Sequence, residues 1–288
     1  MTKNDQKVYA TLEDYGYKNY SWVKKIFKVL NVIGVAIIIA MMYLSIFVIF
    51  IQSVNSSSNV NVFDRFTLKW YLQIFEHRAL RNAIFNTFLV SIITTILATI
   101  MGTFVAVGIH SLEKKKKQRI MLVNNIPILN ADIVTGISLM LIFSLLLPIF
   151  PYLFGPVTLV IAHLFFTLPY VILSVLPKLR EVDVNLMDAA LDLGVKPYKA
   201  LIKVIIPSIV SGIFAGMLMS FTMSLDDFVI SYFTTGNGFD NLSIWIYGSI
   251  GRRSLTPAVY AFSSLLTFVT LISVIGFSLI KSRRRKSK

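Results

Sequence analysis

The sequence contains no cysteine, and this absence excludes disulfide bonds and any chemistry that depends on a thiol. Histidine is scarce as well: the three histidines are scattered, and no His/Glu cluster has the spacing of a zinc site. The phosphate-binding pattern GxxxxGK[ST] is missing, as is any other phosphate-cradling loop. We therefore expect no metal, no cofactor and no catalytic residue on this chain, which is not expected to be an enzyme by itself.

Charged residues are also few, and they are unevenly distributed. They make up 15% of the 288 residues, whereas hydrophobic residues make up 56% and the mean hydropathy is +0.73. This composition is typical of an integral membrane protein rather than of a soluble domain. A net charge of +14 could indicate nucleic-acid binding, but most Lys and Arg residues flank apolar runs. We therefore expect the positively charged residues to lie next to a lipid bilayer, and we expect no nucleic-acid partner.

Six apolar segments are long enough to cross a hydrocarbon core of about 30 Å as helices that rise ~1.5 Å per residue. The expected spans are 30–51, 83–110, 120–147, 156–176, 207–233 and 257–280. The predicted fold class is all-α, a polytopic membrane protein with six transmembrane helices in a domain over residues 29–280. Residues 1–28 are expected to form a cytoplasmic or interfacial arm, and residues 281–288 a basic cytoplasmic tail.

The distribution of positive charge predicts the orientation. With six spans both termini lie on one side, and 22 of the 28 Lys and Arg residues then fall on that side. By the positive-inside rule this side is cytoplasmic. We therefore expect a multi-pass protein of the cell membrane with both termini in the cytoplasm. On the outer side, Thr67 is expected to cap a short helix that carries Trp70 at the membrane interface.

The third span is interrupted by residues that are unusual within a membrane. It contains several polar side chains around a proline and a glycine, namely Asn124, Asn125, Pro127, Asn130, Asp132 and Gly136. Polar residues around a central Pro and Gly are typical of a broken helix that faces a cavity. We therefore expect the third span to be broken.

Between the fourth and fifth spans, residues 181–207 form a polar, cation-bearing hairpin that is expected to contain two short helices. Asn185 is expected to cap the first helix, Gly194 to end it in the left-handed conformation, and Pro197 to begin the second. Ala189 and Ala190 leave a helix surface without bulk, which could enter a groove on a partner protein. An ordinary amphipathic connector could carry the same residues.

The hairpin also resembles a known motif. Its pattern resembles the EAA loop of ABC-importer permeases: Asp188-Ala189-Ala190, then Gly194, then Val204-Ile205-Ile206-Pro207. The spacing is that of the family, whereas Asp replaces Glu, Val replaces Ile and Ile replaces Leu. In that family the loop docks the membrane subunit into its ATPase. The resemblance therefore implies an ATPase-coupling loop at 181–207, with ATP and Mg²⁺ held by a separate ATPase chain.

The fifth span carries a more specific resemblance. Ser220 to Ser231 (SFTMSLDDFVIS) and the following Thr235-Gly236 look like the C-type permease subunit of spermidine/putrescine ABC transporters. Ala131 to Val134 is similar to the same subunit, and the likeness covers roughly residues 62–280. It implies a type I ABC-importer permease fold. It also implies a second related permease, two copies of a cytosolic ATPase and an extracellular or periplasmic polyamine-binding protein.

Three acidic residues fall within otherwise uncharged spans: Asp132, Asp226 and Asp227. An ionised carboxylate at mid-bilayer costs about 2.5–3.5 kcal/mol on insertion scales, so it usually faces a cavity or a partner. Counted along straight helices, Asp132 lies near the midplane and the other two near the outer end of their span. We expect them to mark a cation path, with the Asp pair at its outer entrance. Pairing with neighbouring polar groups, or a solvated helix end, is the alternative.

The outer segment 237–256 combines aromatic and cationic side chains. Trp245, Tyr247, Arg252 and Arg253 are of the types favoured as anchors in protein interfaces. We expect this segment to contact the substrate-binding protein. An interfacial helix with its aromatic belt would account for the same composition.

Other functions remain open from the sequence. Within ABC importers, the permease could serve sulfate, molybdate or iron, although carboxylates in the spans favour a cation. A secondary cation or amine transporter would also need carboxylates in the membrane, but it would not need a docking hairpin. A membrane scaffold without transport activity would need neither feature.

Overall fold

The computed structural model describes residues 21–57, 59, 62–183, 185–236, 238–250 and 257–286; of these, the side chains at 21–24, 250 and 273–286 are not described. In this part of the chain the elements are helical, apart from an isolated bridge between Asn55 and Phe66. The all-α prediction is confirmed. The chain divides into two compact units, Met1–Ile74 with Thr256–Lys288 and Phe75–Leu255. The N-terminal arm expected at 1–28 lies largely outside the described residues.

The first unit joins the first and last long helices of the chain. Helix α2 (Ser21–Ser53) packs against α14 (Ala258–Lys286), with α3 (Lys69–Glu76) beginning nearby. The Tyr71 hydroxyl lies 3.0 Å from Ser53 Oγ and 2.8 Å from Ser264 Oγ, so it links all three helices. The N–H of Lys69 donates to Thr67 Oγ1 at 3.2 Å, which confirms the predicted cap of α3.

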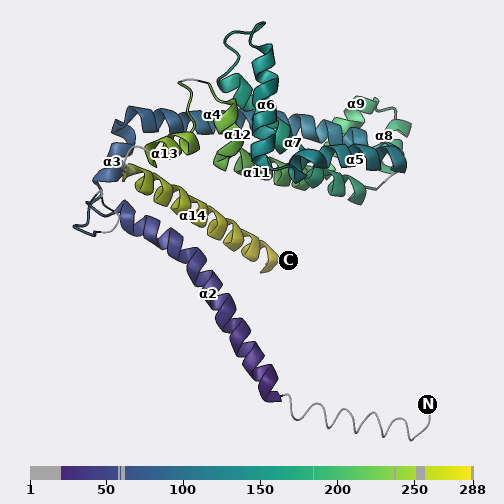
Figure 1. Cartoon of the computed structure of the whole chain (residues 1–288). Coiled ribbons are helices and arrows are strands. Elements are labelled where there is room, and N and C mark those ends of the chain that lie inside the picture. The colour runs from purple at the N-terminus through teal and green to yellow at the C-terminus, as the bar shows by residue number, and fades with distance from the viewer. Residues whose placement is uncertain are drawn as a thin grey trace, which may run out of the picture. The chain divides into compact units, whose positions relative to one another are not determined.

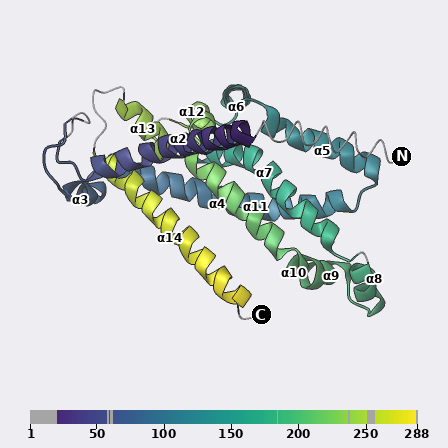
Figure 2. The same cartoon turned by 90° about the horizontal axis from the view of Figure 1, so that it is seen from below.

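The second unit is built around three long helices that lie side by side. These are α4 (Arg78–His110), α7 (Pro156–Glu181) and α11 (Val210–Asp226), and Figures 1 and 2 show them together. Their shared core contains Ala98, Val171 and Val175. A Cβ atom at Gly102 would lie 2.7 Å from Val171 Cγ1, so the glycine lets α4 approach α7 closely. Close helix packing through small residues is typical of membrane bundles.

The third predicted span is broken, as expected. Helix α5 (Lys114–Leu129) and helix α6 (Asp132–Leu146) meet at Asn130–Ala131 with a bend of 101°. Short helices complete the unit: α12 (Val229–Thr234) packs beside α6 and α7, and α13 (Leu242–Ile250) packs beside α4. Figure 1 shows that α6 runs across the direction of α5.

The fifth span was predicted as one helix over 207–233, and this prediction is wrong. The chain passes from a π-helical turn at Leu201–Ile205 into α10 (Ile206–Ser208) and then bends by 74° into α11. Pro207 explains the first interruption, because proline lacks an N–H and its ring clashes with the preceding turn. A second break at Asp227–Phe228 separates α11 from α12.

The number of spans stays a prediction. In the described part of the chain, three helices are each long and apolar enough to cross a membrane, and two bent pairs can each count as one more. The fourth span is longer than expected, since α7 continues past Leu176 to Glu181. The second also begins earlier than expected, at Arg78.

The hairpin at 181–207 has the expected two helices, α8 (Asn185–Asp192) and α9 (Pro197–Ala200). Gly194 has a φ of +79°, its N–H donates to Leu191 O, and the Val195 N–H donates to Ala190 O. These bonds form the Schellman motif, so the role predicted for Gly194 is confirmed. The role predicted for Asn185 is wrong, because its N–H and side-chain amide both donate to Asp183 Oδ1.

Candidate functional site: a cavity lined by three carboxylates

The three aspartates predicted from the sequence line one cavity of about 330 Å³ in the second unit. Asp132 is the first residue of α6, Asp226 is the last of α11, and Asp227 follows it at the break before α12. The other lining residues are Pro127, Ile128, Phe166, Tyr170, Met223, Phe228, Val229 and Ile230. The prediction had placed Asp132 at one depth and the Asp pair at another. The structure brings all three to a shared cavity, and their depths in a membrane stay a prediction.

The two helix breaks create the cavity. The chain turns by 101° just before Asp132 and breaks again after Asp226, so backbone ends from α6 and α11 converge there. At the first break, the Asn130 amide donates to Thr135 Oγ1 at 3.0 Å. Asp132 stands at the N-terminus of a 15-residue helix, where the helix dipole favours a negative charge. The two breaks thus place the N-terminus of α6 and the C-terminus of α11, with their carboxylates, at one cavity.

Asp227 is held more firmly than the other two carboxylates. Its Oδ2 accepts hydrogen bonds from the N–H and the hydroxyl of Ser231, each at 2.7 Å. The N–H of Ile230 donates to Oδ1 at 3.4 Å. Only 9% of the Asp227 side chain is exposed, whereas Asp132 and Asp226 are exposed. Asp227 therefore caps the start of α12, and the other two carboxylates are left accessible.

A buried histidine ties this cap to the neighbouring helices. His163 Nδ1 lies 2.7 Å from Ser224 Oγ, and Nε2 lies 2.8 Å from Ser231 Oγ. Because the single Ser231 hydroxyl proton goes to Asp227, Ser231 accepts from the His163 Nε2–H. Ser224 Oγ also lies 3.3 Å from Ser91 Oγ on α4. These contacts and its burial make His163 a hydrogen-bonded packing residue between the helices.

The electrostatic character of the cavity is acidic. It has three carboxylate side chains, and no Lys or Arg belongs to its lining, all of which the structure describes. In the described ranges, no three His, Asp or Glu side chains are arranged as a metal site, so the carboxylates are not placed as ligands of one ion. A ligand with separated positive charges suits carboxylates placed in this way.

Aromatic rings complete the site, and the sequence reasoning missed them. Phe166 and Tyr170 reach the cavity from α7, and Phe228 reaches it from the second break. On α7, His163, Phe166 and Tyr170 recur at positions i, i+3 and i+7. One face of the fourth span therefore carried a signal for the two α7 rings. The Phe228 ring lies 4.9 Å from Tyr247 and 5.6 Å from Tyr232, measured between centroids. Aromatic faces attract cations within about 6 Å.

Of the segment 237–256, which is predicted to lie on the outer side, the structure describes residues 238–250. The Trp245 ring lies 5.6 Å from the His77 ring, in an edge-to-face arrangement. Tyr247 joins the aromatic group around Phe228 and keeps an exposed surface. Arg252 and Arg253 lie outside the described residues. Contact of this segment with a binding protein stays a prediction.

The residues predicted to form a coupling loop lie at one end of the second unit, where α7 ends and α11 begins, as Figure 2 shows. Asp188, Ala189 and Pro207 are exposed, whereas Ala190 is only 7% exposed and packs inside the chain. The expectation that both alanines offer a surface to a partner is therefore wrong for Ala190. Ala189 is the alanine that a partner could contact.

Comparison with known proteins gave relatives over most of the chain, although no family model matches. The spermidine/putrescine transport system permease protein PotC of Escherichia coli (strain K12) is 30% identical over 249 residues, or 86% of this chain and 92% of that protein. The putrescine transport system permease protein PotI of the same organism is 29% identical over 239 residues, covering 82% and 84%.

Among solved structures, the chain matches a crystal structure of a bacterial ABC transporter involved in the import of the acidic polysaccharide alginate. The TM-score is 0.64, and the match covers 93% of this chain and 99% of that one. The sequences are 14% identical, so this likeness shows the fold alone.

Proposed function

Because this chain belongs to the family of spermidine/putrescine ABC-transporter permeases, we propose that it is the membrane subunit of an importer that carries spermidine or putrescine. The observation that supports the substrate most directly is the cavity lined by Asp132, Asp226 and Asp227. Its volume of about 330 Å³ lies within the usual range for small-molecule sites, roughly 300–1,000 Å³.

The chemistry of a polyamine fits this cavity. Polyamines are chains of positively charged amines joined by methylene groups, and each amine loses hydration on entering the membrane. Exposed carboxylates at Asp132 and Asp226 would offset that loss by Coulomb attraction. The rings of Phe166, Tyr170 and Phe228 offer faces for the ammonium groups and the methylenes. Asp227 is the positioning residue that would hold α12 and its aromatic neighbours in place.

The proposed energy source lies on other chains. The hairpin 181–207 would dock into a cytosolic ATPase that binds ATP and Mg²⁺, with two ATPase copies in the assembly. A second related permease would complete the pathway. Exposed apolar side chains on α5, among them Leu122, Ile126 and Leu129, leave room for a protein or lipid neighbour. The excess of Lys and Arg on one side supports an orientation with both termini and the hairpin in the cytoplasm.

On the outer face, the segment around Trp245 and Tyr247, continuing to Arg252 and Arg253, is the proposed contact for a polyamine-binding protein. Tyr247 is exposed and lies beside Phe228, which lines the cavity. A protein bound there could release its substrate close to the carboxylates. Aromatic and arginine side chains are enriched at such interfaces.

The proposed function is tested by reconstituting this chain with its partner permease and ATPase in lipid vesicles. With binding protein outside and ATP inside, we expect uptake of labelled spermidine or putrescine that stops when ATP is withheld. Sulfate, molybdate and iron serve as alternative substrates. Uptake of one of these instead would contradict the substrate, and polyamine uptake driven by an ion gradient without ATPase would contradict the mechanism.

A further inference from the structure

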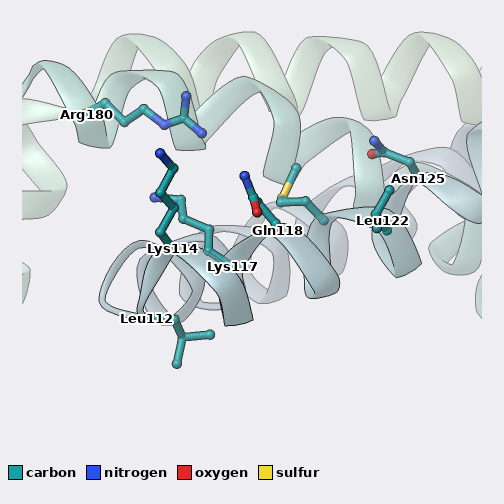
Figure 3. A pocket seen from close by; sticks show the side chains of 8 residues that line it. Leu112, Lys114, Lys117, Gln118, Leu122, Asn125 and Arg180 are labelled. Carbon is teal, nitrogen blue, oxygen red and sulfur yellow. The ribbon is translucent and has the colours of Figure 1, made fainter.

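A second cavity of about 840 Å³ lies between α5 and the end of α7, and it has the opposite charge. Its lining on α5 recurs at helical spacing along one face: Lys114, Lys117, Gln118, Met121, Leu122 and Asn125. Arg180 approaches from α7. Figure 3 shows the Lys114 and Lys117 side chains directed toward the Arg180 guanidinium. Three positive charges therefore converge on one cavity.

These charges are not neutralised by the chain itself. The neighbouring acidic residues are engaged elsewhere: Glu113 pairs with Lys116 at 3.5 Å and Glu181 with Lys178 at 2.7 Å. Within the described residues, Lys114, Lys117 and Arg180 form no ion pair, and no carboxylate lines the cavity. Like charges repel when held close together, so an anion between them would be bound favourably.

The cavity becomes apolar along α5. From Lys114 to Asn125 the helix rises by about 16 Å, and Met121 and Leu122 occupy the middle of that face. Leu122 is 71% exposed, so its side chain is not covered by this chain. The site thus offers cations at one end and, beyond them, the apolar side chains of Met121 and Leu122 between Gln118 and Asn125. A ligand with a phosphate head and a hydrocarbon tail matches this sequence of surfaces.

The location agrees with such a ligand. The N-terminus of α5 and the C-terminus of α7 lie at the same end of the second unit as α8 and α9 (Figure 1). In the proposed orientation this is the cytoplasmic end, where long helices leave the hydrocarbon and lipid headgroups lie. Basic pockets between membrane-spanning helices on this side are suited to acidic lipid headgroups.

We propose that Lys114, Lys117 and Arg180 form a binding site for the phosphate headgroup of an acidic phospholipid. Its acyl chains would lie along Met121 and Leu122. This site does not depend on which solute the transporter carries, and it lies apart from the carboxylate cavity, with which it shares no lining residue.

Native mass spectrometry of the assembled complex tests this site, with phosphatidylglycerol as the acidic probe and phosphatidylcholine as the neutral one. The double variant Lys114→Gln/Lys117→Gln is expected to weaken phosphatidylglycerol binding by tenfold or more and to leave phosphatidylcholine binding unchanged. The matched control is Lys115→Gln/Arg119→Gln, which removes the same charge from residues of α5 that do not line the cavity. The control is expected to bind phosphatidylglycerol as the parent does.

Several results would overturn the proposal. Equal weakening by both double variants would mean a diffuse charge effect, and no weakening by either would mean that no headgroup site exists. Displacement of the lipid by an equal concentration of inorganic phosphate would assign the cavity to a free anion. If the double variant loses a partner subunit while keeping the lipid, the cavity contacts protein instead. If it does not assemble, Arg180→Gln carries the same expectation from α7.

Discussion

Replacing Asp226 by asparagine is expected to lower spermidine uptake about tenfold or more at limiting substrate. The substitution keeps the size of the side chain and deletes its charge. Asp226 is exposed in the carboxylate cavity, so the loss falls on a ligand rather than on the fold. One carboxylate–ammonium contact in a partly hydrated channel is worth on the order of 1–4 kcal/mol. A loss of ~1.4 kcal/mol already corresponds to tenfold.

Asp132→Asn is expected to act in the same direction, since Asp132 lines the same cavity and is also exposed. Uptake into vesicles is measured together with the basal ATPase rate, which should stay near that of the parent. Asp240→Asn is the control, because Asp240 is exposed and does not line the cavity. If Asp132→Asn and Asp226→Asn both transport at the parent rate and apparent affinity, the carboxylates serve structure and not substrate.

Asp227→Asn is expected to lower the free energy of unfolding, unlike the substitutions at Asp132 and Asp226. The Asp227 carboxylate accepts hydrogen bonds from the N–H groups of Ile230 and Ser231. Asparagine would bring an NH2 donor toward these N–H donors in place of one carboxylate oxygen. Leaving buried donors without partners costs about 1–3 kcal/mol each. For this reason the test of substrate charge rests on Asp132 and Asp226.

Ala189→Trp is expected to abolish ATP-driven uptake while the chain still inserts in the membrane. Ala189 is exposed on α8 beside the hairpin's buried Ala190, so an indole there fits this chain but not a closely packed partner groove. Overpacking a tight interface costs about 1–3 kcal/mol or more. Copurification of the ATPase with the tagged permease, and uptake in vesicles, measure the two consequences.

The matched control at the same position is Ala189→Ser, which adds a single oxygen and should preserve both ATPase binding and uptake. Ala190 is unsuitable for this test, because a bulky residue at that buried position would disturb the hairpin itself. Normal uptake by Ala189→Trp, with the ATPase bound as in the parent, would show that this face of α8 does not dock.

Local patterns in the sequence predicted many of the helices and two of their ends. Apolar length predicted the positions of the long helices, because the bilayer thickness sets how many residues a span needs. Gly194 was predicted to end α8 because only glycine adopts a φ of +79° without cost, and Thr67 was predicted to cap α3 through its hydroxyl. Both depend on neighbours within a few residues. The scarcity of charge in the spans likewise singled out the three aspartates.

The remaining features depend on contacts between distant segments. Asp132 lines the same cavity as Asp226 and Asp227 because the chain bends by 101° between α5 and α6. No local sequence pattern predicts the size of that bend. Counting ~1.5 Å per residue along a straight helix therefore separated residues that share a cavity. The hydrogen bonds of His163 join residues 61 and 68 positions away, which a single sequence does not pair. Asp183 and Asn185 lie two residues apart, and each could cap α8. Asp183 accepts the hydrogen bond from the Asn185 N–H.

The central claim is that a polyamine occupies the carboxylate cavity, and substrate protection of an introduced thiol tests it most directly. The chain has no cysteine, so Val229→Cys places a single reactive group in this chain at the cavity wall. With spermidine at ten times its apparent Kd, about one site in eleven is free, so an ammonium-bearing thiol reagent should react roughly tenfold more slowly. Tyr152→Cys, at a side chain that is 98% exposed, should react unchanged. An unprotected Val229→Cys thiol in a complex that is actively transporting spermidine would contradict the claim.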